Sequence, residues 1–214
     1  MIDIKICGLK DIGHLNLLGE LGVAYAGLVF FPKSPRYIPA EPAHQLSAHK
    51  PPALNLVGLF VNPSDEEIAH ILPHVKLDMI QLHGDESPAR VRAIRSKFHL
   101  PVMKALSLAG EDDLSRVPMF EQVTDWLLFD AKAPENSHIP GGNGRAFDWT
   151  LLKNKKFARP WMLSGGLNSR NVTAALDQLR DNPPAAVDVS SGVEVDRGVK
   201  DLDKIKEFVS SVRA

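Results

Sequence analysis

Eight short apolar runs, each followed by a segment of helical period, alternate along this chain of 214 residues. The runs are rich in β-branched residues, and turn residues separate them from the amphipathic segments. Strands that alternate with helices form parallel sheets, because each helix returns the chain to the start of the next strand. Eight units leave about 27 residues for each, close to the lower limit of a (β/α)8 barrel. An open doubly wound sheet is the alternative, but the even spacing predicts an α/β fold of the TIM-barrel type, a single domain over residues 1–214.

The pattern sets approximate bounds for every element. We expect strands at 2–7, 24–30, 55–61, 78–82, 101–105, 126–130, 160–164 and 186–189. The helices are expected at 11–21, 41–49, 64–72, 87–97, 112–121, 149–152, 168–179 and 200–212. Ser64 and Glu67 have the spacing of a capping box at the start of the third helix. Asn168 is the expected N-cap of the seventh.

Composition excludes several classes of function. The formal net charge is −1, so no global field attracts nucleic acid or a membrane surface. No apolar run approaches the ~20 residues that span a bilayer, and the N-terminus lacks a signal-peptide layout. A single cysteine, Cys7, excludes an internal disulfide and a paired-cysteine zinc site. We therefore expect a soluble protein of the cytoplasm, with no nucleic-acid or membrane partner.

Polar residues gather where the predicted strands end, which in this fold is the edge that carries the active site. Because side chains alternate along a strand, Ile4 and Ile6 are expected to face the helices, and Lys5 and Cys7 the barrel interior. The same alternation directs four further polar side chains inward: Gln81, His83, Asp130 and Asp188. Polar groups inside a core cost free energy unless they are paired, so such a cluster indicates a site. We expect Lys5, Gln81, His83 and Asp188 to contact its substrate.

Glycine-rich loops follow the last two strands. "SGG" at 164–166 and "SSG" at 190–192 allow backbone N–H groups to approach an anion closely. These loops form the usual phosphate site of the fold, so we expect Gly165, Gly166, Ser191 and Gly192 to bind phosphate. The alternative is that the Gly-Gly pair only makes a tight turn.

Cys7 and Asp130 are the candidate catalytic pair. A thiolate base and a carboxylic acid, placed across the barrel mouth, can together transfer protons to and from a substrate. Lys5 lies on the same inward face and is expected to lower the pKa of the Cys7 thiol. The alternatives are that Cys7 is a small buried hydrophobic residue and that Asp130 forms a salt bridge or a loop cap.

Two further loops are candidates for contact with a substrate. Arg36, in "FFPKSPRYI" (30–38), is stiffened by neighbouring prolines and can bind a carboxylate, although it can also be an ordinary surface arginine. "PGGNGRAFDW" (140–149) can act as a lid that contributes Gly142 and Gly144, or it can be a plain solvent loop. His70 and His74 have metal-ligand spacing, but without a third ligand we expect a solvated helix face.

Several of these stretches occur in the order found in one family. "KICGLK", "SPR", "QLHGDE", "FD" at 129–130, "GGNG", "SGGLN" and "DVSSGVE" together cover the chain, which closely resembles phosphoribosylanthranilate isomerases. The resemblance implies an Amadori rearrangement of N-(5′-phosphoribosyl)anthranilate to 1-(2-carboxyphenylamino)-1-deoxyribulose 5-phosphate in tryptophan biosynthesis. It implies Cys7 as the general base, Asp130 as the general acid and Arg36 as the group that holds the anthranilate carboxylate.

The same resemblance implies no metal and no organic cofactor, and we expect a monomer, with a weak dimer as the alternative. Two positions depart from the family pattern: Asn143 stands where threonine is more frequent, and Arg197 where proline is common. Three rival readings are the related histidine-pathway sugar isomerase, which has aspartate at the position of Cys7, indole-glycerol-phosphate synthase, and a non-catalytic phosphosugar-binding barrel.

Overall fold

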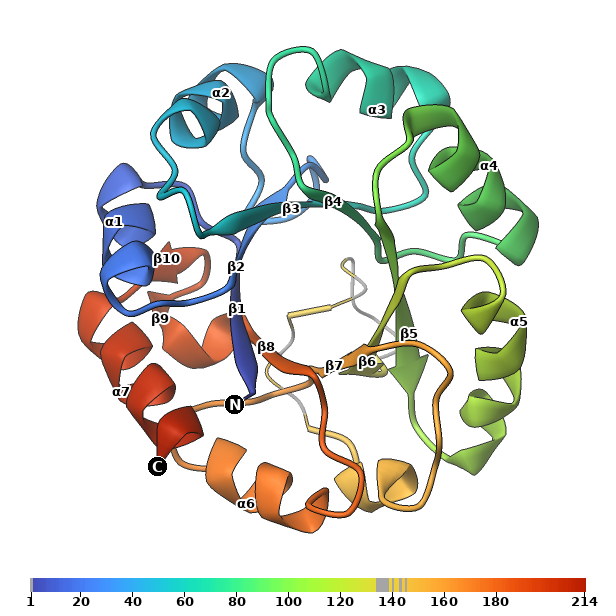
Figure 1. Ribbon diagram of the computed structural model, residues 1–214. Helices are drawn as coiled ribbons and strands as arrows, with labels where there is room; N and C mark the ends of the chain where they lie inside the picture. Colours follow the sequence, from blue (N-terminus) through green and yellow to red (C-terminus); the bar gives the residue numbers. More distant parts are fainter. Residues whose placement is uncertain (1, 134–138, 140, 143, 145) are drawn as a thin grey trace.

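The strands of the chain close into one parallel barrel. The computed structural model describes residues 2–133, 139, 141–142, 144 and 146–214. Within them, each barrel strand pairs with the next in chain order and the last pairs with the first, and Figure 1 shows the helices as an outer ring. The closed barrel predicted from the sequence is confirmed, with strands β1 (Asp3–Cys7), β2 (Tyr25–Val29), β3 (Asn55–Phe60), β4 (Met79–Leu82), β5 (Val102–Leu108), β6 (Trp126–Ala131), β7 (Trp161–Leu163) and β8 (Ala186–Val189).

Four of the seven α-helices in the described part of the chain are capped at the N-terminus by a polar side chain. Ser64 and Glu67 form the expected capping box, and Asp11, Ser87 and Asp201 accept hydrogen bonds at the start of other helices. The helices are α1 (Ile12–Glu20), α2 (Ala40–Ala48), α3 (Asp65–Ile71), α4 (Pro88–Phe98), α5 (Val117–Glu121), α6 (Val172–Gln178) and α7 (Leu202–Arg213), with the 310 helices η1 (Glu111–Arg116), η2 (Trp149–Leu152) and η3 (Ser191–Val193).

Three expectations about helix bounds are wrong, and β5 continues to Leu108, three residues beyond its expected end. The helix expected at 112–121 is divided into η1 and α5, with a proline in the first turn of α5. The helix expected at 168–179 begins at Val172. The side chain of Asn168, its expected N-cap, accepts instead from the N–H of Arg170 in the preceding turn. The last helix begins two residues late, because residues 194–200 form a hairpin of β9 (Glu194–Asp196) and β10 (Val199–Lys200).

The two faces of the strands have different environments, as the alternation predicts. Ile4 and Ile6 belong to the large core between sheet and helices. The lower part of the barrel interior is filled by a second apolar cluster that includes Val57, Met103 and Met162. The buried polar side chains named in the sequence begin above that cluster, so the barrel interior changes from apolar to polar toward the ends of the strands.

Candidate active site

A pocket opens at the carboxyl ends of the barrel strands. It contains about 770 Å³ of empty space, including its open mouth, and its polar lining includes Cys7, Arg36, His83, Asp130, Ser164 and Ser191. Val29 and Leu59 pack with Cys7 into a small apolar cluster on one side, where Phe31 and Val61 join them. The pocket therefore combines an apolar wall with groups that bind anions and transfer protons.

Cys7 reaches the pocket because the neighbouring strand has a glycine beside it. A Cβ atom at Gly27 would lie 2.8 Å from Cys7 Sγ, so any larger residue there would displace the thiol. Burial raises the pKa of Cys7, and the charges of Lys5 and Lys200 oppose this rise without overcoming it. The expected effect of Lys5 is present, but burial is stronger, and the resting group at neutral pH is the thiol.

Lys5 lies beneath the pocket and does not line it. Its side chain is fully buried, and Nζ donates to Asp188 Oδ1 at 2.7 Å. Asp188 also accepts from Ser164 Oγ at 3.1 Å. Burial alone would lower the pKa of Lys5, but the charges of Asp188 and Cys7 raise it, so the lysine stays protonated under the thiol. The structure gives Lys5 a supporting position, whereas the sequence suggested contact with substrate.

His83 connects two other predicted site residues. Its Nε2 atom lies 3.2 Å from Asp130 Oδ2, and its Nδ1 atom lies 3.0 Å from Gln81 Nε2. Asp130 is fixed a second time, because its Oδ1 atom accepts from the N–H of Ala131 at 2.8 Å. Gln81 is fully buried and, like Lys5, supports the pocket from below without lining it.

The loops after β7 and β8 touch through a glycine. A Cβ atom at Gly192 would lie 2.0 Å from the carbonyl oxygen of Leu167, which excludes any side chain at this position. Gly165 and Gly166 both have positive φ, a conformation that glycine adopts without strain. Gly165, Gly166 and Ser191 line the pocket, so the two glycine segments expected to bind phosphate share one end of it.

The segment after β6 crosses the pocket on two glycines. A Cβ atom at Gly141 would lie 2.6 Å from His83 Nε2 and 2.8 Å from Asp130 Oδ2. A Cβ atom at Gly142 would lie 2.5 Å from Arg36 Nη1. The described residues of this segment, in yellow, pass across the barrel opening in Figure 1. Gly144 lies farther out, beside Ser191, and Asn143 is outside the described residues.

Arg36 is buried rather than exposed, which excludes the surface-arginine reading. It lines the pocket, and its guanidinium forms an ion pair with Glu194, from Nε to Oε1 at 2.7 Å and from Nη2 to Oε2 at 2.9 Å. Burial alone would raise the pKa of Glu194, but the hydrogen bond from Arg36 and the charge of Lys200 lower the pKa to about 2. Arg36 therefore faces an ionised carboxylate at physiological pH.

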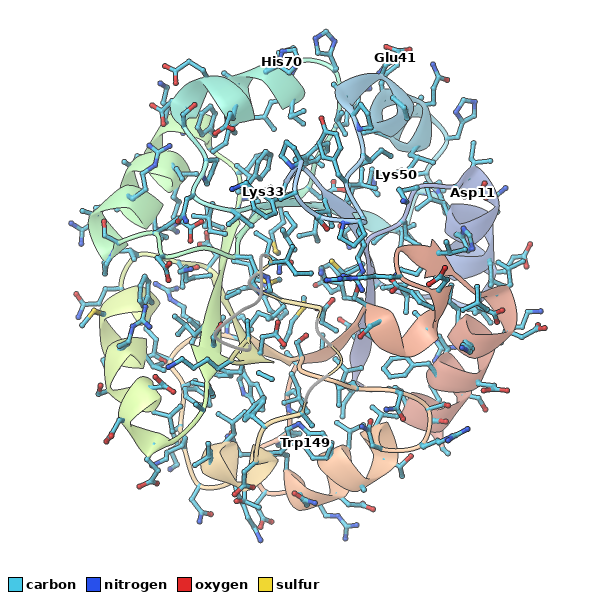
Figure 2. The ribbon with its side chains drawn as sticks, turned by 180° about the vertical axis from the view of Figure 1, so that it is seen from behind. Asp11, Lys33, Glu41, Lys50, His70 and Trp149 are labelled. Atoms are coloured by element: carbon cyan, nitrogen blue, oxygen red, sulfur yellow. The ribbon has the colours of Figure 1, made fainter. Side chains whose placement is uncertain are left out.

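His70 lies near the end of α3 and His74 in the turn that follows it, so the two are not on one helix, and neither lines the pocket. Figure 2 shows His70 at the outer edge of the ring of helices, away from the pocket. In the described part of the chain, no group of three or more His, Cys, Asp and Glu side chains is arranged to hold a metal ion. Among the same residues no helix is long and apolar enough to cross a membrane.

Comparison with known families identifies the kind of barrel. A model of the N-(5′-phosphoribosyl)anthranilate isomerase family matches residues 4–211. The chain belongs to the phosphoribosylanthranilate isomerase family. It is 46% identical to the isomerase of Paramagnetospirillum magneticum, covering 99% of this chain and 97% of that protein. It is also 46% identical to the isomerase of Paracoccus denitrificans, over 100% of this chain and 98% of that one.

Solved phosphoribosylanthranilate isomerases have the same fold as this chain. The enzyme of Thermotoga maritima superposes with a TM-score of 0.88 at 40% identity and covers 100% of this chain and 99% of its own. Another isomerase structure, with a TM-score of 0.85 at 37% identity over 100% and 99% of the two chains, holds reduced 1-(o-carboxyphenylamino)-1-deoxyribulose 5-phosphate. The family resemblance drawn from the sequence motifs is confirmed, and the three rival readings are not supported.

Sequence reasoning missed several residues around the phosphoribosylanthranilate isomerase pocket, among them Gly141, Ser190, Glu194 and Lys200. Glu194 ends the motif "DVSSGVE", yet only the fold places its carboxylate on Arg36, 158 residues earlier. The signal that could have revealed it is the arginine itself, because a buried guanidinium requires a counter-charge. Gly141 precedes the two glycines that were chosen, and its close approach to His83 explains why the motif begins there.

Proposed function

We propose that the chain catalyses the rearrangement of N-(5′-phosphoribosyl)anthranilate to 1-(2-carboxyphenylamino)-1-deoxyribulose 5-phosphate with Cys7 as base and Asp130 as acid. One observation carries the proposal: both groups line one pocket, on strands β1 and β6 that lie three strands apart around the closed ring. Membership of the phosphoribosylanthranilate isomerase family supports the same reaction, a step of tryptophan biosynthesis.

The first step needs an acid. Asp130 donates a proton to the ribose ring oxygen while the C1′–O bond breaks, and the nitrogen lone pair forms a C1′=N bond. His83, 3.2 Å from the carboxylate, holds Asp130 in position for this transfer. Gly141 passes close to both side chains and leaves water little room beside them. Exclusion of water strengthens the interaction between His83 and Asp130.

The second step needs a base. Cys7 acts in its thiolate form: it removes the proton from C2′, the electron pair of that C–H bond forms a C1′=C2′ bond, and the electrons of the C=N bond return to nitrogen. The resulting enolamine tautomerises to the ketone, with the 2′-hydroxyl proton lost and one proton gained at C1′. The rearrangement is internally balanced, so the proposal includes no cofactor and no metal.

The two ends of the substrate have separate binding groups in this proposal. The glycine segments that include Gly166 and Ser191 would cradle the 5′-phosphate through backbone N–H groups, together with Gly165 and Gly192. Arg36 would bind the anthranilate carboxylate. Between them, Lys5 and Asp188 would support Cys7, Gln81 and His83 would support Asp130, and Gly142 and Gly144 would close the mouth.

We also propose a single-domain enzyme that acts in the cytoplasm as a monomer, with a weak dimer as the alternative. The closed barrel uses strands from both ends of the chain, which supports one domain. The lone thiol suits a reducing compartment. A structure of monomers generated from a dimeric Thermotoga maritima isomerase superposes with a TM-score of 0.84 at 37% identity, so association is the alternative to test.

The decisive experiment follows the loss of anthranilate fluorescence on conversion of the substrate. We expect wild type to turn over, and Cys7→Ser and Asp130→Asn each to lose at least ~10²-fold in kcat, the usual contribution of a proton-transfer group. Activity of wild type with no effect of Cys7→Ser would reject the base assignment and make His83 the next candidate. Binding of the substrate without turnover by wild type would reject the enzymatic function.

A further inference from the structure

Arg36, Glu194 and Lys200 form a buried cluster of charges at the edge of the pocket. Lys200 Nζ donates to Glu194 Oε1 at 2.8 Å, and the backbone N–H of Gly198 donates to Oε2 at 3.2 Å. With the two bonds from Arg36, each carboxylate oxygen receives two donors. The side chains of Arg36, Glu194 and Lys200 are 4%, 4% and 2% exposed, so solvent does not compete for these bonds.

The way in which Glu194 holds Arg36 leaves one end of the guanidinium available. A guanidinium has five N–H donors, and Glu194 takes the edge formed by Nε and Nη2. A second N–H of Nη2 points to the carbonyl oxygen of Gly142 at 3.3 Å. In the described part of the chain, Nη1 donates to no protein acceptor. Arg36 also lines the pocket, so its unused donors are available to a ligand there.

The cluster carries an excess of one positive charge. Two cations surround one carboxylate, and a buried charge without a partner is costly. The carboxylate of a bound substrate would complete the pairing, and a planar carboxylate matches the free end of a guanidinium that is already fixed in direction. A substrate whose aryl ring lacks this carboxylate would leave the excess positive charge of the cluster without a partner.

A hairpin makes the arrangement possible. The pairing of β9 with β10 sets Lys200 opposite Glu194. Between them Gly198 turns the chain with a φ of +85°. It packs against Pro35, so a Cβ atom at Gly198 would lie 2.6 Å from the carbonyl oxygen of Pro35. The hairpin thus seats Glu194 beside the loop that carries Arg36. Lys200 also donates to the carbonyl oxygen of Ser190 at 2.8 Å, which anchors the hairpin to the end of β8.

We propose that Glu194, fixed by Lys200, is a positioning residue that orients Arg36 and thereby makes the pocket selective for substrates with an aryl carboxylate. The proposal deepens the proposed isomerase function and rests on it. Glu194 acts through Arg36, so its loss is expected to reduce discrimination between ligands with and without the carboxylate. A residue with only a structural role would weaken the binding of both ligands equally.

The test compares two stable ligands by calorimetry: reduced 1-(o-carboxyphenylamino)-1-deoxyribulose 5-phosphate and its phenylamino counterpart without the carboxylate. We expect wild type to bind the first about 10- to 100-fold more tightly, the range for a charge-assisted hydrogen bond. In Glu194→Gln and in Arg36→Met this preference is expected to fall to about threefold or less. Asp196→Asn, in the same hairpin but exposed, is the matched control and should keep the wild-type preference.

The possible outcomes are distinct. A folded Glu194→Gln variant that keeps the wild-type preference overturns the proposal, and so does an equal loss of affinity for both ligands. If Glu194→Gln does not fold, Glu194→Asp takes its place, because it retains the charge but retracts it by one methylene. A reduced preference in Glu194→Asp supports the proposal. An unchanged preference overturns it. The preference is measured by binding, so it is separate from turnover, whose absence in wild type would reject the isomerase function alone.

Discussion

The amide nitrogen of Gln81 faces one side of the His83 ring, and Asp130 faces the other. Gln81 Nε2 lies 3.0 Å from His83 Nδ1, and an amide nitrogen can only donate. A neutral His83 in this arrangement accepts at Nδ1 and has its proton on Nε2, the nitrogen that lies 3.2 Å from Asp130. A fully buried residue beneath the pocket therefore determines which group faces the proposed acid.

Replacing that amide with a carboxylate should reverse which ring nitrogen of His83 carries the proton. In Gln81→Glu, the new carboxylate accepts from Nδ1–H, so His83 becomes doubly protonated or presents a bare Nε2 to Asp130. We expect kcat to fall by about 10-fold or more, with KM changed little, and the pH profile of kcat to shift. Steady-state kinetics with His70→Asn as the exposed control check this, and an unchanged pH profile would contradict it.

Gly141 sets how closely the segment after β6 covers His83 and Asp130. Gly141→Ala places a methyl group within 2.8 Å of Asp130 Oδ2 and 2.6 Å of His83 Nε2, so the segment or the side chains must move. Because small displacements of catalytic groups are costly, we expect kcat/KM to fall by roughly 10- to 100-fold with little change in Tm.

Gly110→Ala is the matched control for that substitution, because a Cβ atom there would have no heavy atom within 4 Å. It should leave both kcat/KM and Tm at wild-type values. Equal activities of the two variants would show that the segment after β6 tolerates displacement and does not position the acid.

The thiol of Cys7 should titrate above the ordinary range of cysteine. Burial raises its pKa, Lys5 and Lys200 oppose the rise, and Asp188 adds to it. Alkylation of the single cysteine by iodoacetamide should therefore need a higher pH in the native enzyme than in the urea-unfolded chain, where the pKa is about 8.5. Activity should rise with pH over the same interval. Coincident native and unfolded profiles would contradict the effect of burial.

Glu194 should make stability depend on acid pH. Its pKa is about 2 in the folded protein against 4.5 for the unperturbed group, so the unfolded chain binds the proton first as pH falls. The stabilisation is present above pH 4.5 and is lost as pH falls toward 2, by up to about 3 kcal/mol. Urea unfolding should show that the advantage of wild type over Glu194→Gln shrinks in this interval. A constant difference would contradict the assignment.

The sequence predicted the barrel well because each strand has a strong local pattern. Alternation alone placed Cys7, His83 and Asp130 on the interior face, and all three line the pocket. Local patterns did not predict the elements that are formed mainly by polar residues. The segment 194–200 has too few apolar residues to suggest strands, so its hairpin and the roles of Glu194 and Lys200 emerged only from the fold.

The sequence also did not predict how deeply Lys5 and Gln81 are buried. Lys5 was correctly placed beside Cys7, but its effect on the thiol depends on how much water is excluded, and here exclusion of water has the larger effect. Similarly, alternation directs Gln81 and Lys5 inward without saying how far below the mouth they lie. The structure puts both beneath the pocket floor, so they act through Asp188 and His83.

The pairing of β1 with β8 has a consequence during protein synthesis. Cys7 leaves the ribosome well before the neighbours of its strand, which include Asp188 and the hairpin that carries Lys200. A nascent chain that ends before β8 has the proposed base and acid, but neither a closed ring nor a counter-charge for Lys5. The activity of each molecule should therefore begin all at once, when the final strand closes the ring.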